Sequence, residues 1–132
     1  MTHPGDNHHP VHAELAALRY QVPGVVGCVV AGVDGLLILH DTNTGTEPHD
    51  VAALAAGAHG ISRTTGNVLQ QGGFTEVTIH NRNGYLAVYA IGDLALLAMI
   101  GDGALNIARL HLEARPVTTR IAELLQLRTA RH

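Results

Sequence analysis

Short apolar stretches separated by turn dipeptides dominate the second half of the chain. The region from Gly73 to Gly101 divides into three such stretches, with Asn83-Gly84 and Gly92-Asp93 between them. Two-residue hairpin turns require positive φ angles, which Asn, Asp and Gly tolerate best. The pattern therefore predicts three strands joined by two tight hairpins.

A similar hairpin is predicted upstream. Apolar residues from about Val25 to Ala31 and from about Leu36 to His40 flank the dipeptide Asp34-Gly35. Between this hairpin and the three later strands lies a long stretch with helical periodicity, and helical stretches also begin and end the chain. The predicted order is one helix, two strands, one helix, three strands and one helix.

The first helix is predicted to follow a polar tail, residues 1–10, and to end at Pro23-Gly24. Its apolar residues recur at i, i+4, i+7 and i+11, the spacing of one helix face. They are Val11, Leu15, Leu18 and Val22.

The middle helix is predicted to open near Thr46 or Glu47, after a polar loop from Asp41 to Glu47, and to continue to Leu69. Pro48 would lie in its first turn, where a missing N–H costs nothing. Its apolar face consists of Val51, Leu54, Ala58, Ile61, Thr65 and Val68. Gly57 and Gly60 each cost about 1 kcal/mol of helix stability relative to Ala, so we expect close packing to account for them.

The last helix is predicted to begin at Asp102 or Gly103 and to end near Leu127. Pro116 removes one helical hydrogen bond and its ring clashes with the preceding turn, so a kink or break is expected near Arg115. The apolar stripe is predicted to contain Leu105, Ala108, Leu112, Ile121, Leu124 and Leu125.

The predicted strands differ in the patterning of their two faces. Val25–Ala31 and Leu94–Ile100 are apolar on both faces, which is typical of central strands in a sheet covered on both sides. Phe74–His80 alternates instead, which indicates an edge strand with Thr75, Val77 and Ile79 opposite Phe74, Glu76, Thr78 and His80. No Pro or Lys blunts this edge, so pairing with a second copy of the chain would protect it.

Composition indicates a single domain, residues 11–128, after a disordered tail at residues 1–10. The 132 residues are 46% hydrophobic and carry a formal net charge of -3, enough for a core of their own. The absence of a basic run argues against nucleic acid as a partner. No apolar leader or bilayer-length apolar run is present, so we expect a cytoplasmic protein without direct membrane insertion. Cys28, the only cysteine, lies in an apolar run and is predicted to be a buried hydrophobe.

Familiar catalytic motifs are absent from the sequence. A chain without lysine cannot contain a GxxxxGK[ST] phosphate loop, and GxSxG and HExxH do not occur. Gly101-Asp102-Gly103 is better explained as a helix N-cap turn than as an anion site. The histidines clustered near the start match no closed zinc site, and they are His3, His8, His9 and His12. We therefore expect no catalytic residue, no cofactor and no metal.

Three segments together resemble the roadblock family, the group related to dynein light chain roadblock. They are PGVVGCVVAGVDGLLILHD, the small-residue helix VAALAAGAHGISRTTGNVL, and GGFTEVTIHNRNGYLAVYAIGDLALLAMIGDGALNIARLHLEA. The chain looks closest to the bacterial branch that works with small Ras-like GTPases, and its composition suggests an actinobacterial origin. The resemblance implies an α/β (α+β) fold with a five-stranded antiparallel sheet in the order 2-1-5-4-3. The middle helix would cover one face, and the first and last helices the other.

The resemblance also implies a function. Family members pair along the third strand into a homodimer, and their middle helices form a platform for a GTPase. For this chain, the expected dimer interface is Leu54, Ala58, Ile61, Thr65, Thr75, Val77 and Ile79. The expected partner face is His49, Asp50, Ala53, Gly57, His59 and Arg63.

The expected role is that of a non-catalytic adaptor or regulator of a Ras-like small GTPase. The adaptor could bridge the GTPase to a sensor kinase, and partners could recruit the adaptor to the membrane. Two alternatives remain open from the residues. One is a GTPase-activating protein, for which Arg63 and Arg82 are the candidate arginines. The other is a small-ligand sensor, which predicts a roomy pocket between sheet and helices.

Overall fold

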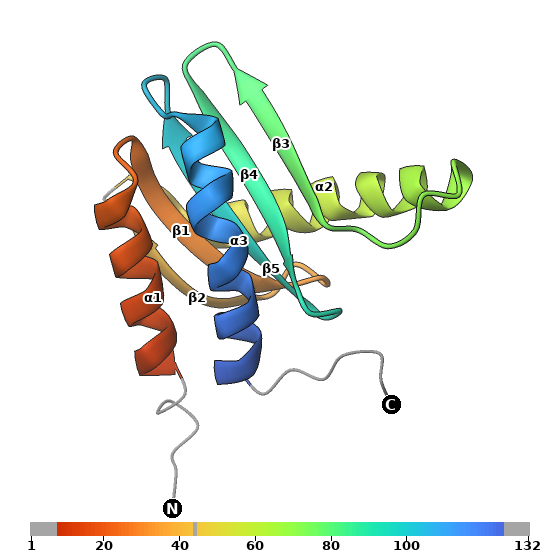
Figure 1. The fold of residues 1–132 in the computed structure, drawn as a ribbon, viewed down its shortest axis with the longest axis horizontal. Coiled ribbons are helices and arrows are strands. Elements are labelled where there is room, and N and C mark those ends of the chain that lie inside the picture. Colours follow the sequence, from red (N-terminus) through yellow and green to blue (C-terminus); the bar gives the residue numbers. More distant parts are fainter. Residues whose placement is uncertain (1–7, 44, 126–132) are drawn as a thin grey trace, which may run out of the picture.

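The computed structural model describes residues 8–43 and 45–125 (Figure 1). Its elements follow the predicted order of helices and strands. They are α1 (His8–Gln21), β1 (Val25–Gly32), β2 (Leu37–Thr42), α2 (Pro48–Val68), β3 (Glu76–Asn81), β4 (Gly84–Ile91), β5 (Ala95–Asp102) and α3 (Ile107–Leu124).

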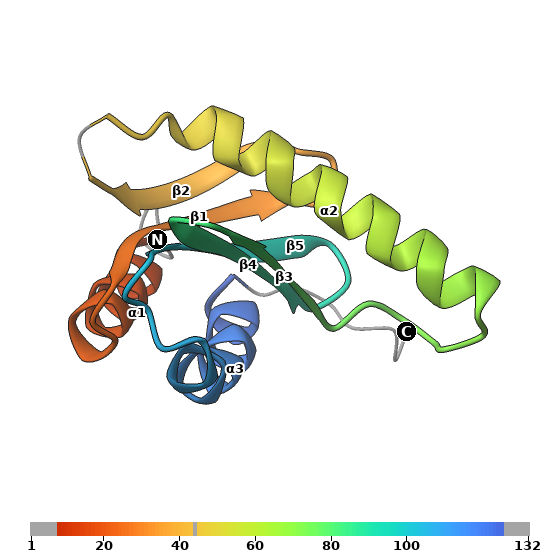
Figure 2. The same cartoon turned by 90° about the horizontal axis from the view of Figure 1, so that it is seen from above.

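The five strands form one antiparallel sheet in the order β2-β1-β5-β4-β3. This confirms the predicted fold: β1 and β5 are central, and β3 lies at an edge. Seen from above, α2 crosses one face of the sheet while α1 and α3 lie side by side on the other (Figure 2). The sheet therefore separates two cores of different size.

The larger core lies between the sheet and the pair α1 and α3, and it buries all four residues predicted for the first helix face. Cys28 is fully buried in this core, as predicted, with its sulfur 3.9 Å from the Leu15 carbonyl oxygen. Burial, and secondarily the nearby Asp41 carboxylate, raises the pKa of the Cys28 thiol to about 12. The thiol therefore stays protonated and unreactive at neutral pH.

The smaller core lies under α2. As predicted, Pro48 occupies the first turn, and the N-cap Glu47 accepts a hydrogen bond from the His49 amide at 3.0 Å. Only Val51, Ala52 and Ala55 of this helix join the cluster of fully buried residues on this face. The rest of the helix is held by few contacts with the sheet.

Several predicted boundaries are wrong. His8, His9 and Pro10 belong to α1 rather than to the tail, because a proline in the first helical turn gives up no hydrogen bond. Asp41 and Thr42 extend β2 instead of belonging to the loop, and Arg19 of α1 pairs with Asp41 at 2.8 Å.

The start of the edge strand is also later than predicted. Phe74 and Thr75 precede β3, which begins at Glu76. Phe74 packs against the core under α2, so it lies on the side of Val77 rather than on the side of Glu76. Apolar contact with α2 thus overrides the alternation at this end of the strand.

The last helix begins later than predicted and is not broken. Asp102 ends β5, and its carboxylate accepts a hydrogen bond from the Ala104 amide at 2.9 Å, while Asn106 is the N-cap of α3. The helix continues through Pro116 to Leu124. Pro116 is exposed, so water can reach the carbonyl that lost its helical partner. The predicted end near Leu127 lies outside the described residues.

The buried stripe of α3 also differs from the prediction. Leu110, Ala114, Val117 and Ile121 face the core, whereas Ala108 is exposed and the Leu112 side chain is 69% exposed. Residues two positions apart point to nearly opposite sides of a helix, so burying Leu110 turns Leu112 to solvent. Ile121 is confirmed, Leu124 and Leu125 pack at the margin of the core, and Leu105 is buried just before the helix.

Glycines of α2 occupy two kinds of surroundings. A Cβ at Gly57 or Gly60 would meet nothing within 4 Å, so the expected close packing is not found among the described residues of this chain. A Cβ at Gly66 would lie 2.7 Å from the backbone oxygen of Gly72, where the chain turns back toward β3. Only Gly66 therefore has a steric reason to lack a side chain.

This difference predicts opposite effects for two identical substitutions. Gly66→Ala is expected to lower the free energy of unfolding by about 1–3 kcal/mol, because the α2–β3 loop must shift. Gly60→Ala, the matched control, is expected to raise it by about 0.5–1 kcal/mol through helix propensity. Urea unfolding followed by circular dichroism measures both, and a stabilised Gly66→Ala variant would contradict the assigned contact.

Candidate functional site

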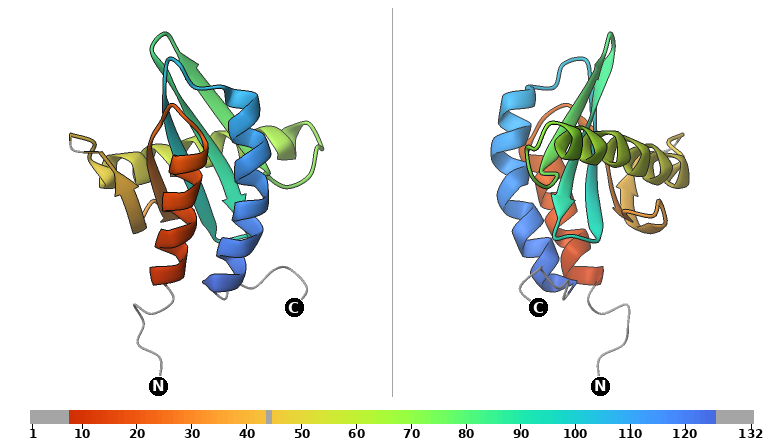
Figure 3. Two further views of the ribbon diagram at one scale, coloured as in Figure 1. Left: turned by 60° about the vertical axis from the view of Figure 1, so that its left-hand side comes forward. Right: turned by 90° about the vertical axis from the view of Figure 1, so that its right-hand side faces the viewer.

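The C-terminal half of α2 extends past the β3 edge of the sheet (Figures 1 and 3). After Ala55, Gly66 is the next fully buried residue of the helix. This overhanging half carries apolar side chains that the chain itself does not cover. The large exposed ones there are Ile61 (73%), Val68 (72%) and, just after the helix, Leu69 (58%), and Leu54 (61%) is exposed nearer the start of α2.

The exposed apolar residues share one side of α2, which we call the apolar stripe: Leu54, Ala58, Ile61, Thr65 and Val68. Ala58 is half-buried against the core, and the others are exposed. The Thr65 hydroxyl donates to the Ile61 carbonyl at 2.8 Å, so its hydrogen-bonding capacity is used within the helix. The first four members of this stripe were predicted at the dimer interface, whereas Val68, which has the same helical spacing, was predicted only for the apolar face of the helix.

The apolar stripe lies beside the β3 edge. A shallow groove of about 460 Å³ separates them, and Ile61, Thr65, Phe74 and Val77 contribute to its lining. Val77 is half-buried, Ile79 is 39% exposed and Thr75 is exposed. Among the described residues β3 is paired only with β4, so its outer edge presents backbone groups without a strand partner there. Of the residues predicted for the dimer interface, Ile61, Thr65, Thr75 and Val77 line this groove, whereas Leu54, Ala58 and Ile79 lie outside its lining.

Polar contacts on the other face of the sheet hold the edge strand in place. The Arg115 guanidinium donates two hydrogen bonds to the Glu76 carboxylate, at 2.9 and 2.8 Å, and lowers the pKa of Glu76. The Tyr89 hydroxyl lies 2.7 Å from His111 Nδ1. Burial is the main cause of the raised pKa of Tyr89, which therefore stays neutral. These contacts tie β3 and β4 to α3 and give the exposed edge a fixed position.

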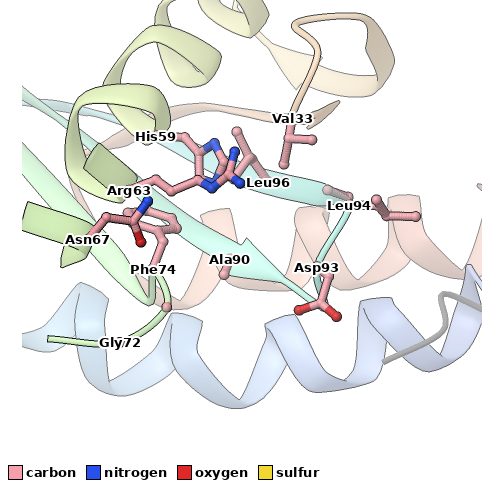
Figure 4. A pocket seen from close by; sticks show the side chains of 13 residues that line it. Val33, His59, Arg63, Asn67, Gly72, Phe74, Ala90, Asp93, Leu94 and Leu96 are labelled. Atoms are coloured by element: carbon pink, nitrogen blue, oxygen red, sulfur yellow. The ribbon is translucent and has the colours of Figure 1, made fainter. Parts of the chain in front are cut away.

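The residues predicted for the partner face are not all on one surface. His49, Asp50, Ala53 and Gly57 are exposed along the N-terminal half of α2. His59 and Arg63 instead line a pocket between α2, the residues before β3 and the β4–β5 turn (Figure 4). The pocket has a volume of about 490 Å³. Sequence analysis assigned no site role to its other lining residues, among them Asn67, Phe74, Asp93 and Leu96.

The His59 ring is partly buried and lies near the positive charge of Arg63. The His59 and Phe74 rings meet edge to face, with centroids 5.0 Å apart. Partial burial, and secondarily the nearby Arg63 charge, lowers the pKa of His59 below its ordinary value. His59 is therefore a neutral imidazole at pH 7, able to form hydrogen bonds without adding charge.

Within residues 8–43 and 45–125, no three His, Cys, Asp or Glu side chains are grouped so that they could hold a metal ion; His3 lies outside this part of the chain. None of the helices in the described part of the chain is long and apolar enough to span a membrane.

The model of the Roadblock/LC7 domain family matches residues 12–101. The chain belongs to this family. The matched residues cover most of α1, all of α2 and nearly the whole sheet, including the apolar stripe and the β3 edge. No curated protein matches the chain in a sequence comparison.

Solved structures share this roadblock fold. A Roadblock/LC7 domain from Streptomyces avermitilis superposes with a TM-score of 0.80 at 22% identity, covering 86% of this chain and 96% of its own. The gliding protein MglB from Thermus thermophilus gives 0.83 at 15% identity, covering 96% of each chain. An MglB with a tetrameric arrangement gives 0.84 at 15% identity, covering 96% and 95%.

Proposed function

We propose that this roadblock domain forms a homodimer through the apolar stripe and the β3 edge. The observation that carries the proposal is the exposure of large apolar side chains on the overhang of α2, next to an unpaired strand edge. Pairing two β3 strands antiparallel would satisfy the free backbone groups, and it would bring the overhanging helices together. The structure of an MglB in a tetrameric arrangement supports self-association within this fold.

The homodimer would serve as a non-catalytic adaptor or regulator of a Ras-like small GTPase in a bacterial signalling system. This role comes from the family resemblance, and the likeness to MglB structures supports it. The exposed surface at His49, Asp50, Ala53 and Gly57 would contact the GTPase. The mechanism of the homodimer would be conformational. Its paired α2 helices would hold the switch segments of the GTPase, or would bridge the GTPase to a sensor kinase at the membrane.

An activating role would require an arginine beside the γ-phosphate of the bound nucleotide. Arg63 and Arg82 are the candidates, since neither forms an ion pair with another described residue, whereas Arg19, Arg109, Arg115 and Arg120 do. The adaptor hypothesis expects unchanged hydrolysis in the complex. The activating alternative expects faster hydrolysis that is lost when the correct arginine is replaced by alanine.

The test is binding to the Ras-like GTPases of the same host, loaded with GDP or with a non-hydrolysable GTP analogue, with GTP hydrolysis followed in parallel. Nucleotide-selective binding at an unchanged rate would support the adaptor role. Selective binding with faster hydrolysis would identify an activator. Lack of binding in both nucleotide states would overturn the GTPase hypothesis and leave the homodimer to be judged separately.

A further inference from the structure

The pocket that contains Arg63 lies on a different side of α2 from the apolar stripe. His59, Arg63 and Asn67 follow one another at four-residue spacing and line the pocket. Arg63 is two positions from both Ile61 and Thr65, which places it nearly opposite them around the helix. The pocket and the groove beside the apolar stripe share Phe74 in their linings, but Arg63 itself lies on the side of α2 away from the stripe. An inference about the pocket does not rest on the proposed function.

The lining of this pocket combines polar and apolar groups in about equal measure. Leu96 and Ala95 lie at its base with exposed fractions of 1% and 2%, and the half-buried side chains of Val33 and Phe74 form walls. Its volume of about 490 Å³ lies within the range of small-molecule sites, which typically combine apolar walls with few polar groups. The pocket can thus take up an apolar body the size of a substituted aromatic ring or a short alkyl chain.

The polar groups that line this pocket favour a negatively charged ligand. Figure 4 shows the Arg63 side chain extending next to His59. Arg63 has no hydrogen bond or ion pair with any other described residue, and a guanidinium binds carboxylates in a bidentate manner. His59 and the Asn67 amide add hydrogen-bonding groups without charge.

The surroundings limit the charge that the pocket can hold. Asp93 lines the pocket from the β4–β5 turn, and α2 ends at Val68, so the negative end of its dipole is close to Asn67. Both features oppose a phosphate or another multiply charged anion. One guanidinium in these surroundings suits one negative charge.

We infer that this pocket binds a small organic monocarboxylate, whose charge pairs with Arg63 while its apolar body lies against Leu96, Val33 and Phe74. Binding there would couple the overhanging half of α2 to the β4–β5 turn. The site would give the domain a ligand input that is separate from its interface with a second copy.

The proposal can be tested on the isolated full chain with 3-phenylpropionate as the probe, followed by NMR chemical shifts of backbone amides and of the Arg63 side chain. We expect saturable shifts at Arg63, Phe74 and the β4–β5 turn. Arg63→Ala should weaken binding about tenfold or more, because a hydrogen-bonded charge pair is lost. Arg82→Ala, which removes an exposed arginine from the β3–β4 turn, should leave the affinity unchanged.

Two further probes separate the charge from the apolar body. 3-Phenylpropan-1-ol should bind at least about tenfold more weakly than the carboxylate, for the same reason as the arginine variant. Inorganic phosphate should fail to displace the carboxylate. Equal binding of the alcohol, displacement by phosphate, or no saturable shift would overturn the proposal. Shifts at this pocket from a bound GTPase but none from 3-phenylpropionate would also overturn it, by assigning the pocket to protein docking.

Discussion

Replacing Ile61 by arginine is expected to convert the homodimer into a monomer. Ile61 is the most exposed large apolar residue of the apolar stripe, at 73%, and it lies in the middle of that stripe. Hot-spot side chains cluster near the centre of an interface and each contribute about 2 kcal/mol or more, so with Ile61 as a hot spot the dissociation constant should rise at least about 30-fold. Burying the introduced charge would weaken the dimer further. Sedimentation equilibrium across a range of protein concentrations measures this change.

The chain offers a matched control for this experiment. Leu112 is 69% exposed, close to the value for Ile61, but it belongs to α3 on the opposite face of the sheet. Leu112→Arg should therefore leave the dissociation constant unchanged, and circular dichroism should show that both variants are folded. A wild-type chain that stays monomeric at high concentration, or an Ile61→Arg variant that still dimerises, would contradict the assigned interface.

Replacing Leu110 by alanine is expected to lower the free energy of unfolding by about 2–5 kcal/mol, the usual cost of removing a fully buried leucine side chain. Leu110 is completely buried between α3 and the sheet, in the same core as Leu97 and Met99. Truncation would leave a cavity in this core. Urea unfolding of the wild type and the variant measures the loss.

Leu112→Ala is the control for that substitution because it removes the same atoms two residues away. Its side chain is exposed, so we expect a change within about 0.5 kcal/mol. The comparison also tests which side of α3 faces the core. Equal losses in the two variants would show that Leu112 is buried in solution and would contradict the orientation of α3.

Much of the fold follows from local patterns in the sequence. The predicted Asn83-Gly84 turn was wrong by one residue, because β3 ends at Asn81 and β4 begins at Gly84, so Arg82 and Asn83 form the turn and neither has a positive φ. The four-residue face of α1 and the doubly apolar strands β1 and β5 were predictable because each depends on neighbours within a few positions. The alternation of β3 identified it as an edge strand for the same reason. The candidate interface on α2 could also be predicted, since its spacing is helical.

Other features depended on contacts between distant segments. Helical spacing placed Leu112 in the core of α3, yet packing against the sheet selected Leu110 and left Leu112 in solvent. One proline inside a periodic segment predicted a kink or break near Arg115, and the structure shows no break, since the helix continues through Pro116 to Leu124.

The sequence by itself determined the order of the elements and the apolar composition of their faces, because hydrogen bonding and hydrophobic periodicity act over three or four residues. Only the tertiary structure decided which apolar face of a helix is buried and which remains exposed. It also decided that the half-buried His59 and the exposed Arg63 line a pocket with Phe74 and the β4–β5 turn. The physical reason is that burial depends on how helices lie across the sheet, which is set by side chains far apart in the chain.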